Sequence, residues 1–261
     1  MSSQFSIMKT ILIIGGTSGI GESFARRFHA QGKTVIITGR RTERLEKLKS
    51  ELGKGLETYA MDNNDLSALP KHIETLFKQY PNLDTVWVNS GIQYTSSIKD
   101  IDTSSEERIE QEVMTNVTSP MIIARHVVPK LLAQDFPTTF MMSGSGLGFV
   151  PMGIFPVYCA TKAAVHSYMV GIRQTLQGSN VNVIEIVPPA VGTELDAPHK
   201  ELTKKFPAPL TLDEFGNEVF GKLENGKVGE MKEVAAGTAN PRVETWRGSI
   251  GKVLEERGIG G

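Results

Sequence analysis

Short apolar runs alternate with longer amphipathic segments along most of the chain. The runs lie at residues 9–14, 34–38, 57–61, 85–89, 138–142 and 182–187, and each is short enough for one buried strand. The intervening segments carry helical periodicity, as where Ile20, Phe24 and Phe28 recur on one face after the first run. Strands that alternate with helices predict an α/β fold, with one doubly wound parallel sheet and helices on both of its faces.

A glycine-rich turn, Gly15-Gly16-Thr17-Ser18-Gly19-Ile20-Gly21, follows the first apolar run. Glycines let backbone N–H groups approach a phosphate closely, and the N-terminus of the next helix adds partial positive charge. Many such turns only connect a strand to a helix. The turn by itself therefore leaves dinucleotide binding open.

Tyr158 and Lys162 stand four residues apart, which places both side chains on one face of a helix. A phenol with an ordinary pKa near ~10 is a poor acid at pH 7, and a neighbouring ammonium lowers that pKa by favouring the anion. We interpret the pair as a proton-transfer device. The alternative is a solvated helix face, where this spacing is also common.

Together, Gly15-x-x-x-Gly19-x-Gly21 and Tyr158-x-x-x-Lys162 resemble the short-chain dehydrogenase/reductase family. The resemblance covers roughly residues 8–195 and implies a single Rossmann-type domain. The family's serine, thirteen residues before the tyrosine, matches Ser145 (158 − 145 = 13), whereas Ser143 stands at the wrong spacing.

This resemblance implies hydride transfer between a nicotinamide and a carbonyl or secondary alcohol. Tyr158 is expected to act as acid or base, Lys162 to hold the nicotinamide ribose and keep the tyrosine acidic, and Ser145 to hydrogen-bond the substrate oxygen. The residues expected to bind the cofactor are Gly15, Thr17, Ser18, Gly19, Ile20, Gly21, Arg40, Arg41, Asp62, Asn63, Asn89, Gly91, Tyr158, Lys162, Pro188, Val191 and Thr193.

The family's helix asparagine matches Asn116. A Ser-x-x-Glu capping box at Ser104 predicts the start of its helix. Ile109, Val113, Asn116 and Val117 then share one face, so Asn116 is expected to point inward. The resemblance implies that it anchors a water that returns protons. A satisfied core amide is the alternative.

Some positions depart from the family pattern. Ile14 replaces the usual threonine, and Val88 and Ser90 replace residues of an Asn-Asn-Ala-Gly turn. Pro189 stands where glycine is usual, and because proline fixes φ it stiffens the turn beside the substrate.

The choice of cofactor depends on the residues after the second apolar run, Gly39-Arg40-Arg41. An acidic residue there binds the ribose 2′-hydroxyl of NAD, whereas arginines form charge-assisted hydrogen bonds to the 2′-phosphate of NADP. We therefore expect NADP(H) to be favoured over NAD(H). The alternative is that Arg40 and Arg41 merely begin a solvated helix at 41–52.

Length and composition suit one domain over residues 1–261, since 261 residues with 39% hydrophobic content can bury a sizeable core. We divide it into a cofactor-binding half (about 8–115), a catalytic half (about 116–195), a substrate lid (about 193–220) and an atypical C-terminal tail (about 222–261). In the tail, 229–234 is the candidate last strand, and 248–257 a short helix with Ile250, Val253 and Leu254 as its apolar face.

A net charge of −1 gives no field for binding nucleic acid or an anionic membrane. The single cysteine, Cys159, excludes an internal disulfide and suits a reducing, cytoplasmic compartment. Five histidines show no ligand spacing, so no metal is expected.

Substrate identity is less accessible. Candidate substrate-binding residues are Gln93, Ser145, Gly146 and Pro189, and apolar walls at 146–152 and Phe155 favour a hydrophobic carbonyl or alcohol. The lid is broken up by Pro198, Pro207 and Pro209, although a passive surface excursion is an alternative. The family resemblance also implies a homodimer or homotetramer.

Two other classes of function stay open. A dehydratase, isomerase or cyclase on this fold would keep the cofactor site without exchanging hydride, and a cofactor-sensing regulator would bind NADP without turnover. Such regulators usually lose the tyrosine or the lysine, and this chain has both.

Overall fold

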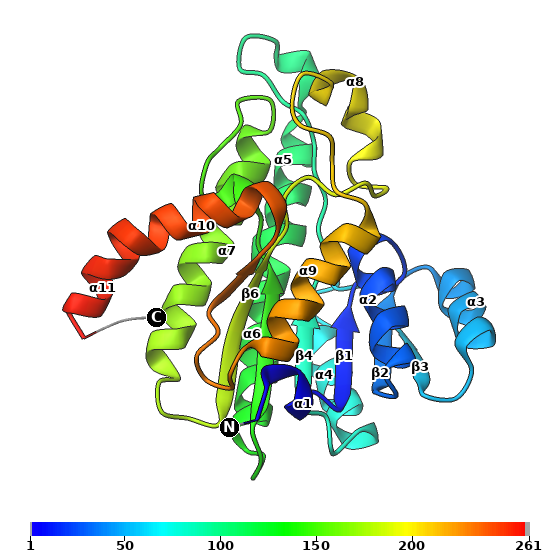
Figure 1. Cartoon of the computed structure of the whole chain (residues 1–261). Coiled ribbons are helices and arrows are strands. Elements are labelled where there is room, and N and C mark those ends of the chain that lie inside the picture. The colour runs from blue at the N-terminus through cyan, green and yellow to red at the C-terminus, as the bar shows by residue number, and fades with distance from the viewer. Residues whose placement is uncertain (1, 259–261) are drawn as a thin grey trace.

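The computed structural model describes residues 2–258. Across these residues, seven parallel strands form one sheet in the order β3-β2-β1-β4-β5-β6-β7 (Figure 1). The strands are β1 (Thr10–Ile14), β2 (Thr34–Gly39), β3 (Leu56–Ala60), β4 (Thr85–Val88), β5 (Thr138–Ser143), β6 (Val181–Val187) and β7 (Glu233–Ala235). The six apolar runs thus coincide with β1 to β6, and the α/β prediction is confirmed. The last strand is shorter and begins later than the expected 229–234.

Alternating side chains of the strands serve two separate cores. In β1, Ile11 and Ile13 point into one core, and Leu12 and Ile14 point into the other. All four are fully buried, because a strand covered on both faces has no solvent side.

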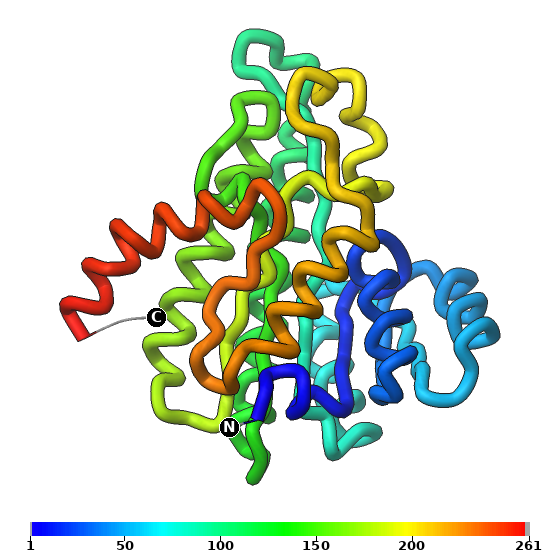
Figure 2. Tube along the Cα trace, in the orientation of Figure 1, coloured from blue at the N-terminus to red at the C-terminus, as the bar shows by residue number. Residues whose placement is uncertain are grey.

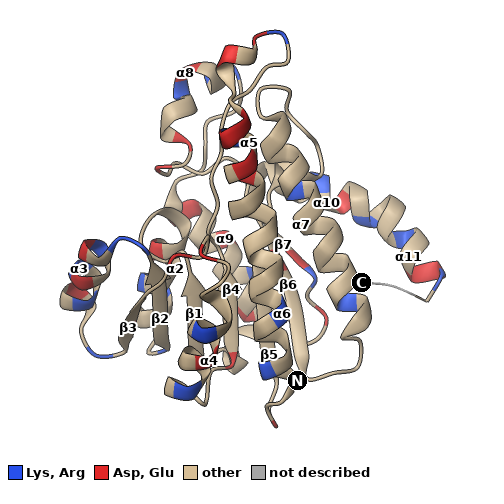
Figure 3. Ribbon diagram, turned by 180° about the vertical axis from the view of Figure 1, so that it is seen from behind, with Lys and Arg blue, Asp and Glu red and all other residues tan. Residues whose placement is uncertain are grey.

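The helices that cover the first face are α1 (Gln4–Ile7), α2 (Gly19–Ala30), α3 (Thr42–Leu52) and α9 (Leu212–Asn225). The second face is covered by α4 (Leu69–Gln79), α6 (Ser119–Leu132) and α7 (Pro156–Thr175). Figure 1 shows α2 and α9 in front of the sheet, and the reverse view in Figure 3 shows α4 and α6 in front. The order of the sheet reverses between β1 and β4, which opens a crevice at their carboxyl ends.

One long helical segment runs through α5 (Glu106–Val113), a π-helical turn (Met114–Thr118) and α6. Ser105, not Ser104, caps α5, since its side chain accepts the Arg108 N–H, and the expected capping box is therefore wrong by one residue. The expected face is also wrong in part. Asn116 is buried, but Ile109 and Val113 are 41% and 40% exposed, because the π turn adds a residue between them and Asn116.

The expected lid divides into two parts. Residues 193–211, here called the lid segment, include a 3₁₀ turn (Ala197–His199) and α8 (Lys200–Thr203) and rise beside the loop after β4 (Figure 2). His199 Nε2 lies 3.3 Å from the Gln93 carbonyl oxygen of that loop. The assignment of 212–220 to the lid is wrong, because these residues begin α9, and Phe215 and Val219 are fully buried in the core.

The C-terminal arm (residues 240–257) comprises α10 (Asn240–Trp246), a π-helical turn (Arg247–Gly251) and α11 (Lys252–Glu256). The helical expectation for 248–257 holds, but its apolar face does not rest on the body of the protein: Ile250 and Val253 are 58% and 45% exposed. Figure 1 shows the arm projecting sideways from the sheet.

Charged residues of both signs are interspersed along the chain, while the ribbons of α6 and α7 include few of them (Figure 3). Within residues 2–258, no helix combines the length and the apolar character that a membrane crossing requires.

Candidate active site

A cavity of about 1140 Å³ lies at the carboxyl ends of the strands, between the glycine turn, the loop after β4, α7 and the lid segment. Most of the residues selected from the sequence line it together. They are Gly15, Thr17, Ser18, Gly19, Ile20, Arg40, Arg41, Asp62, Asn63, Asn89, Gly91, Gln93, Ser145, Gly146, Tyr158, Lys162, Pro188, Pro189, Val191 and Thr193. Two others, Gly21 and Asn116, are not among the residues that line the cavity.

The glycine turn is shaped by close backbone approaches. Gly15 has φ 89°, and a Cβ atom there would lie 2.8 Å from the backbone nitrogen of Ser90. A Cβ atom at Gly21 would lie 2.1 Å from the Gly15 carbonyl oxygen, which accepts a hydrogen bond of 3.0 Å from Asn89 Nδ2. The turn thus leads directly into the N-terminus of α2 with backbone facing the cavity, as a bound pyrophosphate requires.

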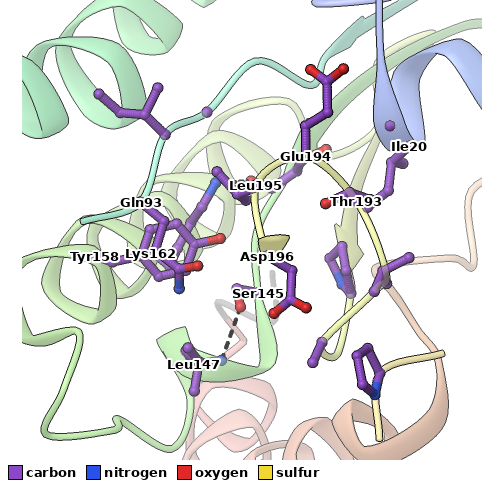
Figure 4. Close-up of a pocket in the computed structure, with 18 of the residues that line it drawn as sticks. Ile20, Gln93, Ser145, Leu147, Tyr158, Lys162, Thr193, Glu194, Leu195 and Asp196 are labelled. Atoms are coloured by element: carbon purple, nitrogen blue, oxygen red, sulfur yellow. Dashed lines mark hydrogen bonds between the residues drawn. The ribbon is translucent and has the colours of Figure 1, made fainter. Parts of the chain in front are cut away.

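Ser145, Tyr158 and Lys162 meet at one end of the cavity (Figure 4). The Ser145 hydroxyl oxygen accepts the Leu147 N–H at 3.1 Å, and the same hydroxyl is a hydrogen-bond neighbour of the Tyr158 phenol. Lys162 Nζ lies 5.5 Å from the centre of the Tyr158 ring and donates to the Ser143 carbonyl oxygen at 2.8 Å. The Ser143 hydroxyl is occupied elsewhere, between Trp87 and Asn89.

Burial controls the protonation of this group. It raises the pKa of Tyr158 well above its ordinary value, an effect that the neighbouring Ser145 hydroxyl partly opposes. Burial lowers the pKa of Lys162 to about 8, against the attraction of the Glu185 and Glu112 carboxylates. In this structure the Lys162 amine is turned to the Ser143 carbonyl oxygen, so the expectation that Lys162 makes Tyr158 more acidic stays a prediction.

Asn116 is 1% exposed, and its hydrogen bonds fix the backbone beside the site. Its Oδ1 accepts the Ile92 N–H at 2.9 Å, and its Nδ2 donates to the Ile92 carbonyl oxygen at 2.8 Å and to Thr161 Oγ1 at 3.1 Å. Asn116 thereby joins the loop after β4 to α7, the helix that carries Tyr158.

Asn63 connects the turn after β3 to this scaffold. Its Nδ2 donates to Ser90 Oγ at 3.1 Å, and its carbonyl oxygen accepts the Ser119 hydroxyl. Asp62 is exposed at the cavity wall and accepts the Asn64 N–H at 3.0 Å.

The arginines after β2 differ in their contacts. Arg40 is exposed at the cavity wall, with no hydrogen bond or ion pair to any residue within 2–258. Arg41 donates to Thr17 and Ser18 at 3.0 and 2.8 Å and lies 3.2 Å from the Glu194 carboxylate. Arg44 Nη1 reaches the same carboxylate at 2.8 Å. The lid segment thus already places an anion against two of the three arginines.

A buried polar cluster lies against Gly144, the residue before Ser145. His166 Nδ1 is 2.7 Å from Glu185 Oε2, and Glu185 Oε1 occupies the space that a Cβ atom at Gly144 would need. The carboxylate of Glu233 nearby is held by Arg173 and Arg247. With two arginines on Glu233, we interpret this cluster as an ion-pair network rather than a metal site.

Sequence reasoning missed five groups at or beside the cavity: Arg44, Glu112, Glu194, Asp196 and Arg242. Glu112 is 1% exposed, its Oε1 accepts the Tyr94 N–H at 3.1 Å, and burial raises its pKa to about 7. Asp196 Oδ2 is buried without a hydrogen-bond partner among the described residues. None of the five belongs to a sequence motif. Only Arg44 could have been noticed, because it follows Arg40 and Arg41 closely in the sequence.

A doubly wound parallel sheet whose glycine turn and helix N-terminus open into a long cavity defines a dinucleotide-binding α/β protein. The family model described as short chain dehydrogenase matches residues 9–203. The chain belongs to this family of oxidoreductases.

Two relatives and one solved structure are similar to this chain. The chain is 34% identical to "Uncharacterized oxidoreductase DltE" of Bacillus subtilis over 220 residues, 84% of this chain and 85% of that protein. It is 34% identical to "NADP-dependent 3-hydroxy acid dehydrogenase YdfG" of Escherichia coli K12 over 182 residues, 70% and 72% of the two chains. The closed form of a serine dehydrogenase complexed with NADP⁺ superposes with a TM-score of 0.76 at 28% identity, covering 87% of this chain and 94% of that one.

Proposed function

We propose that the protein is an NADP(H)-dependent oxidoreductase that reduces a carbonyl group to a secondary alcohol, with Tyr158 as the proton donor. The observation that carries the proposal is the meeting of Ser145, Tyr158 and Lys162 in the same cavity as the glycine turn. When bound, the reduced nicotinamide supplies the hydride for the carbonyl carbon. The glycine turn, Asn89 and Thr193 are the residues that would hold it.

The protein's own part in the reaction is to polarise and protonate the carbonyl oxygen. Ser145 donates its O–H to that oxygen when substrate is bound, and Tyr158, kept neutral by burial, donates the proton as negative charge develops. Lys162 has two further N–H donors beyond its bond to Ser143, and these suit the ribose hydroxyls. The neutral phenol is in the protonation state that carbonyl reduction requires.

The preference for NADP(H) over NAD(H) rests on the three arginines that follow β2, two in the turn and Arg44 in α3. Arg40 is unpaired at the cavity wall, and Arg41 and Arg44 already bind a carboxylate there. A 2′-phosphate carries more charge than a carboxylate and forms charge-assisted hydrogen bonds with guanidinium groups. The NADP-dependent relative supports the same preference.

Tyr158→Phe tests the proposal. We expect the variant to fold and to bind NADPH as the wild type does, while NADPH-dependent reduction, followed by absorbance with a panel of ketones and aldehydes, falls by about 10²- to 10⁴-fold. Tyr80→Phe removes a hydroxyl remote from the cavity and serves as the control. Full activity of Tyr158→Phe would rule out the acid role.

We further propose one domain that assembles as a homodimer or homotetramer in the cytoplasm. The sparsely charged helices α6 and α7, together with the exposed Ile109, Val113 and Leu132, support self-association. The free, buried thiol of Cys159 suits a reducing compartment. Size-exclusion chromatography with light scattering measures the assembly.

A further inference from the structure

Arg242, on α10 of the C-terminal arm, reaches the catalytic loop. It lines the same cavity as Ser145 and Tyr158. Gly146 leaves room for it: a Cβ atom at Gly146 would lie 3.1 Å from Arg242 Nη1 and 3.4 Å from its Cδ. The guanidinium therefore lies against the residue that directly follows the serine expected to bind the reacting oxygen.

The charge of Arg242 has no partner within residues 2–258. Other partly buried arginines are paired, such as Arg173 with Glu233 and Arg41 with Glu194. Arg242 has neither a hydrogen bond nor an ion pair. The thiol of Cys159 is an electrostatic neighbour of Arg242, but burial raises the pKa of this thiol, so it is neutral at pH 7 and does not compensate the guanidinium.

The lid segment adds charges of both signs to the cavity wall. Asp196 lies next to Glu194 and Thr193 on the strip of lid shown in Figure 4, and Glu194 is engaged by the arginines of the cofactor end. Lys200 and Lys204 line the wall from α8. Arg242 lies against Gly146, directly after Ser145, and the apolar side chains of Leu147, Met152 and Phe155 line the cavity with it.

Resting on the proposed carbonyl reduction, we propose that Arg242 binds a carboxylate of the substrate, and that the substrates are short oxo acids and the corresponding hydroxy acids. Arg242 lies against Gly146, the residue next to Ser145. A carboxylate on Arg242 and a carbonyl oxygen at Ser145 therefore suit two groups of one short substrate. The apolar walls then contact the rest of the substrate's carbon chain. The substrate expected to be hydrophobic therefore also carries a carboxylate at one end.

Arg242→Gln tests this assignment with two matched substrates, 3-oxobutanoate and its methyl ester. The wild type should favour the acid, and the ratio of kcat/KM for acid over ester should fall by about 10- to 100-fold in the variant, the usual worth of a hydrogen bond to a charged group. The loss should lie mainly in KM for the acid, because Arg242 binds the carboxylate rather than the reacting oxygen. Lys252→Gln, which removes an exposed cation from the same arm, should keep the wild-type ratio.

A wild-type preference for the ester, or a ratio that Arg242→Gln leaves within about twofold, would overturn the proposal. Binding of unreactive probes to the cofactor-free protein keeps the test independent of turnover. In saturation-transfer NMR, butanoate should bind better than butanamide to the wild type, and this difference should disappear in Arg242→Gln. If no carbonyl is reduced but the binding of butanoate still depends on Arg242, the proposed reaction fails while the carboxylate site is supported. Equal binding of butanoate and butanamide to the wild type refutes the carboxylate site.

Discussion

Replacing Glu194 by Gln should strengthen the binding of NADPH. In the structure, this carboxylate of the lid segment lies 3.2 Å from Arg41 Nη1 and 2.8 Å from Arg44 Nη1, at the arginines proposed to hold the 2′-phosphate. Both anions need the same guanidinium groups. NADPH must therefore displace Glu194 or accept its negative charge nearby, whereas a neutral amide removes most of this competition.

The magnitude follows from the exposure of the pairs. The Glu194 side chain is 58% exposed and the two arginines 36% each, so each pair contributes about 0.2–1 kcal/mol. Two pairs give about 0.4–2 kcal/mol, and with tenfold in affinity for about 1.4 kcal/mol, NADPH should bind about 2- to 30-fold more tightly to the variant. NADH lacks the 2′-phosphate, so its affinity should change little.

Titration of NADPH and NADH by nicotinamide fluorescence at low salt measures both dissociation constants. Glu201→Gln, which changes another lid carboxylate paired only with Lys204, is the control. The NADPH effect should shrink as salt is added, since exposed pairs are screened. Equal tightening of both cofactors, or weaker NADPH binding by Glu194→Gln, would show that the carboxylate does not compete with the 2′-phosphate.

Three further outcomes can be measured. Burial lowers the pKa of Lys162 to about 8, so its ammonium is present below that pH. The rate of carbonyl reduction at saturating NADPH should therefore fall as pH rises through 8. Glu112→Gln removes a charge that raises the pKa of Lys162, so the midpoint of this fall in rate should move to lower pH. Gly21→Ala forces a Cβ atom to 2.1 Å from a backbone oxygen and should abolish NADPH binding in calorimetry, whereas Gly221→Ala, in an open part of α9, should leave it intact. Phe24→Ala removes a fully buried ring and should lower the free energy of unfolding in urea by about 3–5 kcal/mol; a change under 1 kcal/mol would contradict the packing.

The sheet was predictable because each strand of a two-sided parallel sheet must be apolar along its whole length, as residues 11–14 are. The glycine turn and Tyr158 with Lys162 were also visible, since their chemistry depends on spacing within one turn or one helix. The cavity brings them together as the family resemblance implied.

The residues that sequence analysis missed reach the site only through the tertiary fold. Arg242 and Glu194 meet the site through tertiary contacts, from an arm and a lid whose local sequence carries no signal for those contacts. The pKa of Tyr158 depends on the fold in a related way. Spacing shows that an amine is near, but the pKa depends on how much water surrounds the phenol, and that becomes known only when the chain is folded.

The π turn at Met114–Thr118 makes the register of the long helix a determinant of the site. A π turn amounts to one residue inserted into an α-helix, and each residue of an α-helix turns the chain by about 100°. Deleting a single residue here would give a regular helix in which Glu112 and Asn116 could not both keep their present directions. Length variation at this point would thus uncouple the loop after β4 from α7 while leaving every catalytic side chain in the sequence.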